Sequence, residues 1–228
     1  MPAVPQKGSI LHAKDILLSI DHIYDKFEIP QNLRMHMKKV AGVGALLCEN
    51  WSGPEITETD VVAVLLIHDL GNIAKFDLSS TSRVEVMEDI GYLKELKKRI
   101  TAKYGYGDHE ATFNMAKELA VEKSIISLLQ RMSSFSAENH TLRNREDYEI
   151  MVCVYSDLRV SPYGVVSLKE RINDIIDRYA EKPIFEEFKT LPKYAPLLEE
   201  QVFKNVTISP EQINEKTVSR IASKFGSM

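Results

Sequence analysis

The sequence predicts an all-α protein built as a single bundle of helices. Hydrophobic residues recur at helical spacing along most of the chain, and short breaks rich in proline or glycine separate these stretches. Alternating strand patterns joined by hairpin turns do not occur. At 228 residues the chain is long enough to bury a core without disulfides as staples.

The first two helices are expected over residues 9–27 and 31–50. Between them Pro30 disfavours the α-conformation at Ile29, so the first helix must end there. Trp51-Ser52-Gly53-Pro54 closes the second helix. The apolar stripe of the first helix is formed by Ile10, Leu11, Leu17, Ile20, Ile23, Tyr24 and Phe27.

A third helix is expected over residues 58–69, starting after Thr57. It is apolar on every side through the run Val61–Ile67, and a helix without a polar face is a buried one. A strand is the competing interpretation of such a run. The lack of other strand patterns in the chain favours the helix.

The remaining chain alternates loops and shorter helices. Residues 71–82 are expected to form a loop, and further helices are expected at 83–103, 109–121, 124–136, 145–159 and 165–180. A last helix is expected to open at Ser209, with Pro210 at its first position and Gln212 completing a capping box. A separate C-terminal domain after Pro183 is the alternative, although about 45 residues are few for an independent core.

The composition narrows the functional class. The hydrophobic fraction of 44% and the charged fraction of 27% are ordinary for a globular protein. The net charge of −4 argues against dedicated nucleic-acid binding. No apolar run is long enough for a signal peptide or a membrane span, and Cys48 and Cys153 lie in apolar stretches as expected for buried free thiols. We therefore expect a cytoplasmic protein.

The dipeptide His68-Asp69 is the most informative feature, because it follows directly on the apolar run. A buried carboxylate is costly unless it is paired or binds a metal, although Asp69 could also mark a helix end that emerges into solvent. His36 and Asp157 stand at the edges of two other apolar helices. Two imidazoles and two carboxylates suit one divalent ion, such as Mn, Fe, Ni, Co, Zn or Mg. Because neighbouring residues are about 100° apart around a helix, the other two ligands must come from helices packed beside it.

The pattern His36 … His68-Asp69 … Asp157 resembles the signature of the HD superfamily of metal-dependent phosphohydrolases. Three stretches of sequence resemble the family around these residues: Glu28-Ile29-Pro30-Gln31-Asn32 with Val40-Ala41, Leu65-Leu66-Ile67-His68-Asp69-Leu70-Gly71, and Asp157-Leu158-Arg159 with Leu168-Lys169-Glu170-Arg171-Ile172. The resemblance covers about residues 25–180 and depends on motifs that are specific only in a helical context.

The resemblance implies an HD-type helical bundle and one metal ion bound by these four residues. The core would span about residues 25–180 of a single domain 1–228, with C-terminal helices from 184–228 packed on it. The implied activity is hydrolysis of a phosphate ester by metal-activated water. A nucleotide or a small phosphometabolite is the expected substrate, and the sequence leaves homo-oligomerisation open.

The chain departs from the family at one position. HD nucleotidases and alarmone hydrolases often carry a glutamate three residues after the HD aspartate, and here that residue is Asn72. Asp77 matches a catalytic aspartate of the nucleotidase branch and is the expected base, with capping of a turn as its alternative role. His109 is a second candidate, as a phosphate contact or general acid or as a solvated histidine. The adjacent His-His pair of two-metal HD enzymes is missing, so one ion is expected.

Lys75 and Arg159 lie close in sequence to the expected ligands, and we expect them to bind substrate phosphate, Arg159 in bidentate fashion. The alternative function is a non-catalytic HD module that binds a metal or nucleotide as a sensor or interaction domain, and Asn72 favours it. A plain helical interaction protein with a coincidental placement of His and Asp is a further alternative.

Overall fold

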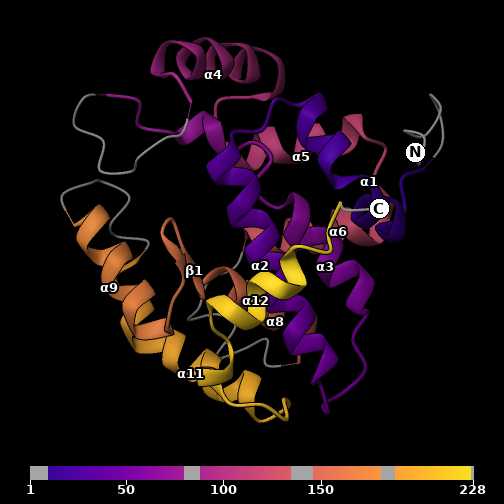
Figure 1. Cartoon of the computed structure of the whole chain (residues 1–228), viewed down its shortest axis with the longest axis vertical. Helices are drawn as coiled ribbons and strands as arrows, with labels where there is room; N and C mark the ends of the chain where they lie inside the picture. The colour runs from indigo at the N-terminus through magenta and orange to yellow at the C-terminus, as the bar shows by residue number, and fades with distance from the viewer. Residues whose placement is uncertain (1–9, 80–87, 135–145, 181–187, 227–228) are drawn as a thin grey trace.

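The computed structural model describes residues 10–79, 88–134, 146–180 and 188–226. Helices dominate these residues, which confirms the all-α class (Figure 1). In chain order the helices are α1 (Ala13–Lys26), α2 (Gln31–Glu49), α3 (Glu58–Ile67), η1 (Asn72–Lys75), α4 (Ile90–Tyr104), α5 (Asp108–Glu118), α6 (Lys123–Ser133), α8 (Tyr148–Asp157), α9 (Leu168–Tyr179), α11 (Leu191–Phe203), η2 (Pro210–Gln212) and α12 (Glu215–Ala222).

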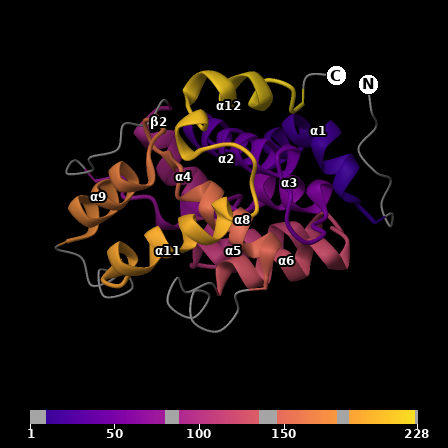
Figure 2. The same cartoon turned by 90° about the horizontal axis from the view of Figure 1, so that it is seen from below.

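The apolar helix α3 is the centre of the bundle, with α1, α2, α6 and α8 packed around it (Figures 1 and 2). All side chains from Val61 to Ile67 are buried, so the predicted buried helix is confirmed and the alternative of a strand is wrong. Tyr24 of α1 donates its hydroxyl to the Leu66 carbonyl over 2.7 Å. The Tyr24 hydroxyl, a polar group buried against α3, is therefore hydrogen-bonded.

The predicted break between α1 and α2 lies at residues 27–30. Glu28 adopts a left-handed backbone with φ of 52°, which is unfavourable for a residue with a Cβ atom. Arg99 of α4 donates two hydrogen bonds to the Glu28 carboxylate, over 2.8 and 2.9 Å. This ion pair ties the strained turn to α4.

The segment after α3 is more ordered than the predicted loop. Residues 72–75 form the 3-10 helix η1, which packs on α5. Gly71 lies so close to α5 that a Cβ atom there would come within 2.4 Å of the Thr112 nitrogen and 2.7 Å of the Asp108 oxygen. The Gly71 nitrogen also donates to the Thr112 hydroxyl over 2.9 Å. Glycine at position 71 thus lets η1 lie directly against the start of α5.

Several predicted boundaries were wrong. Helix α4 begins at Ile90 behind its cap Asp89, whereas residue 83 was expected; residues 83–87 lie outside the described part of the chain. Residues 160–165 form a short antiparallel hairpin, β1 (Val160–Ser161) with β2 (Gly164–Val165), so α9 starts at Leu168 and the region 25–180 is not helical throughout. The capping box of Ser209 and Gln212 is confirmed, but it opens only the 3-10 turn η2.

The C-terminal helices pack on the rest of the bundle. Helix α12 packs against α2, and α11 packs against α8 and α9 (Figure 2). In the described residues no helix combines the length and the hydropathy that crossing a membrane requires. Both cysteines are free thiols, with Cys153 buried as expected and Cys48 only partly so.

We predict that Glu118 of α5 makes stability depend on pH. Its carboxylate accepts hydrogen bonds from Lys103 and Tyr104, both over 2.8 Å, and Lys26 of α1 lies 3.3 Å away. The hydrogen bond from Lys103, opposed by burial and assisted by Tyr104 and Lys26, lowers the pKa of Glu118 to about 2. Because this pKa is depressed in the folded state, the carboxylate stabilises the fold above the ordinary glutamate pKa, and the stabilisation is lost as the pH falls towards 2.

The measurement is urea unfolding of the wild type and Glu118→Gln from neutral pH downwards. Glu118→Gln should be the less stable protein at neutral pH, and the two free energies of unfolding should converge in acid. Glu55→Gln, in the exposed segment before α3, is the control. A difference between wild type and Glu118→Gln that stays constant with pH would contradict the assignment.

Candidate metal centre

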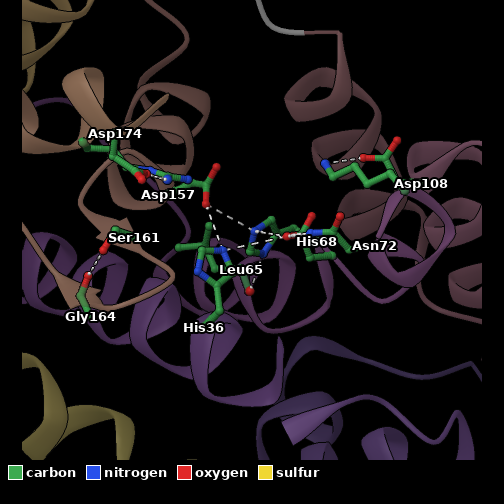
Figure 3. Close-up of polar contacts among 12 residues, drawn as sticks. His36, Leu65, His68, Asn72, Asp108, Asp157, Ser161, Gly164 and Asp174 are labelled. Carbon is green, nitrogen blue, oxygen red and sulfur yellow. Dashed lines mark hydrogen bonds and ion pairs between the residues drawn. The ribbon is translucent and has the colours of Figure 1, made fainter. Parts of the chain in front are cut away.

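The four residues predicted as metal ligands lie together at the C-terminal end of α3. Figure 3 shows three of them, His36, His68 and Asp157. His36 Nε2 is 3.1 Å from Asp157 Oδ1, and His68 Nε2 is 3.6 Å from the same oxygen. Asp69 Oδ2 is 3.8 Å from each of the two imidazole nitrogens. The ligand atoms of His36, His68 and Asp69 lie within 4.8 Å of one another.

The helix packing produces this convergence. Helix α3 ends at Ile67, so His68 and Asp69 lie where the chain leaves the core. His36 lies in the second turn of α2, and Asp157 is the last residue of α8. Helices α2 and α8 both pack on α3 and on each other. The side chains therefore come from three different helices, as the angle between His68 and Asp69 requires.

His68 is oriented for binding through Nε2. Its Nδ1 lies 2.8 Å from the Leu65 carbonyl oxygen, which can only accept, so the neutral ring carries its proton on Nδ1. The Nε2 atom is buried and has no hydrogen-bond partner among the described residues. An unsatisfied buried nitrogen is costly, and a metal ion in contact with it removes that cost.

The spacing of the donor atoms also fits an ion. Ligand atoms each about 2.1 Å from a metal are about 3.0 Å apart at a right angle and about 3.4 Å apart at a tetrahedral angle. The four separations between an imidazole nitrogen and a carboxylate oxygen, from 3.1 to 3.8 Å, are close to these values. Two imidazoles and two carboxylates are donors that borderline divalent ions accept. The residues present therefore fit one divalent ion.

The electrostatics of the centre favour positive charge. Burial raises the pKa of Asp157, but His36 and His68 outweigh that effect and hold it well below its ordinary value. Burial lowers the pKa of His68, whereas Asp69 and Asp157 raise it, and the net value is about 9. The carboxylates thus attract a cation into the centre, and a proton and a metal ion compete for the same atoms.

Asn72 contacts a ligand directly, a role that the sequence argument missed. Its side-chain amide donates to Asp69 Oδ2, the oxygen that faces both imidazoles. The amide oxygen of Asn72 is buried and has no partner within the described ranges. The spacing of three residues between Asp69 and Asn72 could have suggested this contact. Asn72 therefore orients a ligand of the candidate centre.

Lys75 lies on the α5 side of the centre. Its Nζ is 2.6 Å from Asp108 Oδ2, and half of its side chain is exposed. Burial lowers the pKa of Lys75, but Asp69 and Asp108 raise it, to about 12. The side chain is therefore a permanent cation within electrostatic range of the ligand Asp69. Asp108, its partner in Figure 3, was not singled out from the sequence.

Arg159 has a different role from the expected contact with substrate phosphate. The residue is 3% exposed. Its Nε donates to the Val166 carbonyl and its Nη1 to the Tyr155 hydroxyl, both over 2.7 Å. Its Nη2 donates to the carbonyls of Ile213, over 3.0 Å, and Pro210, over 3.2 Å. The guanidinium thus joins α8 to the chain before α12, and these contacts occupy the donors that a phosphate would need.

The two predicted catalytic residues are both exposed. Asp77 follows η1, and its Oδ1 accepts hydrogen bonds from the Ser79 nitrogen, over 3.1 Å, and hydroxyl, over 2.6 Å. This is the turn-capping arrangement. His109 lies in the first turn of α5, next to Asp108.

Comparisons of the chain with protein-family models, with curated proteins and with solved structures find no match. The geometry of the centre and the sequence pattern of its residues are therefore the features that indicate a function.

We predict that Asn72 tunes metal affinity without being a ligand. Removing a side chain that orients a metal ligand typically costs about 10–100-fold in affinity. Asn72→Ala should weaken binding of Mn²⁺ or Co²⁺ by that amount, whereas Asp69→Ala should abolish it. Isothermal titration of the metal-free proteins measures both effects.

Asn50→Ala is the matched control, because Asn50 donates its amide to the Leu46 carbonyl elsewhere on α2. Its metal affinity should equal that of the wild type. Unchanged affinity in Asn72→Ala would show that the contact with Asp69 does not orient a ligand.

Proposed function

We propose that the protein is a metal-dependent phosphohydrolase with an HD-type helical core, acting on a phosphate ester of a nucleotide or small phosphometabolite. The observation that supports it best is the convergence of His36, Asp69 and Asp157 on the buried His68 Nε2, which has no hydrogen-bond partner among the described residues. The same four residues carry the resemblance to the HD superfamily. The donor set and the sequence pattern thus favour the same centre.

The four side chains would bind one divalent ion: Mn, Fe, Ni, Co, Zn or Mg. When bound, such an ion supplies Lewis acidity to a water nucleophile and to a phosphoryl oxygen. The chain contributes the orientation of the ligands, through the Leu65 carbonyl on His68 and the Asn72 amide on Asp69. Lys75 adds a positive charge beside Asp69, which suits a phosphate group on the α5 side.

Proton transfer requires a further group, because the amide of Asn72 is not a base near neutral pH. We assign this step to Asp77, a carboxylate on the loop that leaves the centre through η1. Its exposure leaves it accessible to water, while its hydrogen bonds to Ser79 support the alternative of a turn cap. His109, at the start of the helix that packs on η1, is the next candidate.

A non-catalytic metal-binding module is the second candidate function. The contact between Asn72 and Asp69 favours it, because the position at which related hydrolases often carry a glutamate here serves to hold a ligand. Such a module would bind the ion with the same four residues and show no turnover.

The experiment that separates these functions is a screen of phosphorylated metabolites with Mn²⁺, Co²⁺ or Ni²⁺ added. We predict turnover by the wild type and none by Asp69→Ala, which removes a partly buried charge together with its ion and should remain folded. Circular dichroism checks the fold of the variant. Metal binding without turnover of any compound would favour the non-catalytic module, and equal turnover in Asp69→Ala would place the activity elsewhere.

We predict that Asp77→Asn lowers turnover at least about tenfold at full metal occupancy, a cost of about 1.4 kcal/mol in the barrier. Turnover and metal content are measured on the same preparation. A turn-capping role predicts instead a small loss of stability, because asparagine can keep the bonds to Ser79, and near-normal turnover. That second result would remove Asp77 from the mechanism and leave His109 to be tested.

A further inference from the structure

Helix α9 lies on the side of the candidate centre opposite α5. It packs on β1, the first strand of the hairpin that follows α8. In Figure 3, Asp174 of α9 and Asp108 of α5 are drawn on opposite sides of His36, His68 and Asp157. Burial lowers the pKa of Lys75, whereas Asp69 and Asp108 raise it, with a smaller contribution from Tyr179 in the last turn of α9.

Three charged residues follow one face of α9. Arg171, Asp174 and Arg178 are spaced three and four residues apart, which places them on one side of a helix. Their side chains are only 12%, 19% and 19% exposed, although most charged residues of a surface helix are solvated. The stripe lies next to the buried Ile172 and Ile175 and therefore faces the protein.

The two arginines use Asp174 unequally. Arg178 donates from Nε to Asp174 Oδ1 over 2.9 Å and from Nη2 to Oδ2 over 2.7 Å, which uses one full edge of its guanidinium. Arg171 donates only from Nη1, to Asp174 Oδ2 over 2.7 Å. The Asp174 carboxylate therefore binds Arg178 through two nitrogens but Arg171 through only one.

The free edge of Arg171 is the kind that binds an anion. Its Nε is buried and makes no hydrogen bond to any described residue. Nε and Nη2 form one edge of a guanidinium, and this edge matches two oxygens of a carboxylate or phosphate. A buried N–H without an acceptor is costly. Arg171 also shares the single carboxylate of Asp174 with Arg178.

We propose that Arg171 binds a phosphoryl group of the substrate through its Nε–Nη2 edge, with Asp174 and Arg178 as positioning residues. The identity of the anion as substrate rests on the proposed phosphohydrolase function. Arg171 takes the role that the sequence argument gave to Arg159. The substrate phosphate then lies between the cation on α9 and Lys75 on the opposite side.

The test is isothermal titration of the full-length, metal-free chain with inorganic phosphate and with pyrophosphate. Arg171→Gln should weaken binding at least about tenfold, because a hydrogen bond to a charged group is lost with the charge. Arg171→Lys should give an intermediate loss, since lysine keeps the charge but not the planar edge. The matched control is Arg99→Gln, which removes another arginine that makes a two-point ion pair and should bind phosphate like the wild type.

The Asp174→Asn variant distinguishes a role of Asp174 in positioning Arg171 from a purely electrostatic effect of its charge. Removal of a negative charge near an anion site should tighten phosphate binding if Asp174 merely opposes the anion. If Asp174 positions Arg171, the same change should weaken binding, even though the overall charge becomes more favourable. Tighter binding by Asp174→Asn would overturn the positioning role.

Equal phosphate affinity of the wild type and both Arg171 variants would overturn the proposal, as would a wild type that binds neither probe. Circular dichroism and thermal unfolding confirm that each variant is folded. If the wild type hydrolyses a phosphate ester and Arg171→Lys leaves its KM unchanged, the inference fails while the proposed function stands. If phosphate binding depends on Arg171 but no ester is hydrolysed, the anion site stands and the proposed function fails.

Discussion

The burial of α3 on every side is the constraint on which the rest of the structure depends. A helix with apolar side chains all round is stable only if other helices surround it, and α1, α2, α6 and α8 do so. The same packing determines where polar groups can meet, because His68 and Asp69 directly follow the C-terminal end of this helix. The neighbouring α2 and α8 place His36 and Asp157 at that point. The candidate centre is thus a direct consequence of how the apolar helix is covered.

The sequence predicted the core helices better than the peripheral ones, for a physical reason. Hydrophobic patterning reports burial, and α1, α2, α3 and α8 contribute many of the buried side chains of the core. The start of α4 depends on a local cap, Asp89, and not on periodicity. At α9 the capping box of Ser167 and Glu170 is visible in the sequence and marks the true start at Leu168, whereas the prediction began this helix at residue 165, in the second strand of the hairpin. Local capping hydrogen bonds therefore determine where α4 and α9 begin.

The ligands could be predicted because each is a metal-competent residue at the edge of an apolar helix, whereas the partners of the arginines could not. Arg159 is close in sequence to Asp157, yet the carbonyls of Pro210 and Ile213 bind its guanidinium. Those oxygens come from a distant part of the chain, and their position depends on how the C-terminal helices pack. Proximity in sequence therefore assigned Arg159 to the substrate when the tertiary structure uses it to hold the fold.

The charges around the centre indicate where a phosphate would be held. With a divalent ion bound, two neutral imidazoles and two carboxylates make the centre itself electrically neutral. On the α5 side, Asp108 balances the charge of Lys75. On the α9 side, Arg171 and Arg178 share the single carboxylate of Asp174. Arg171 is the less constrained of these two residues, and its Nε is buried without a hydrogen-bond partner among the described residues. Because Lys75 has a carboxylate of its own whereas Arg171 shares one, an anion is attracted more strongly to Arg171. Lys75 is then the weaker second cation.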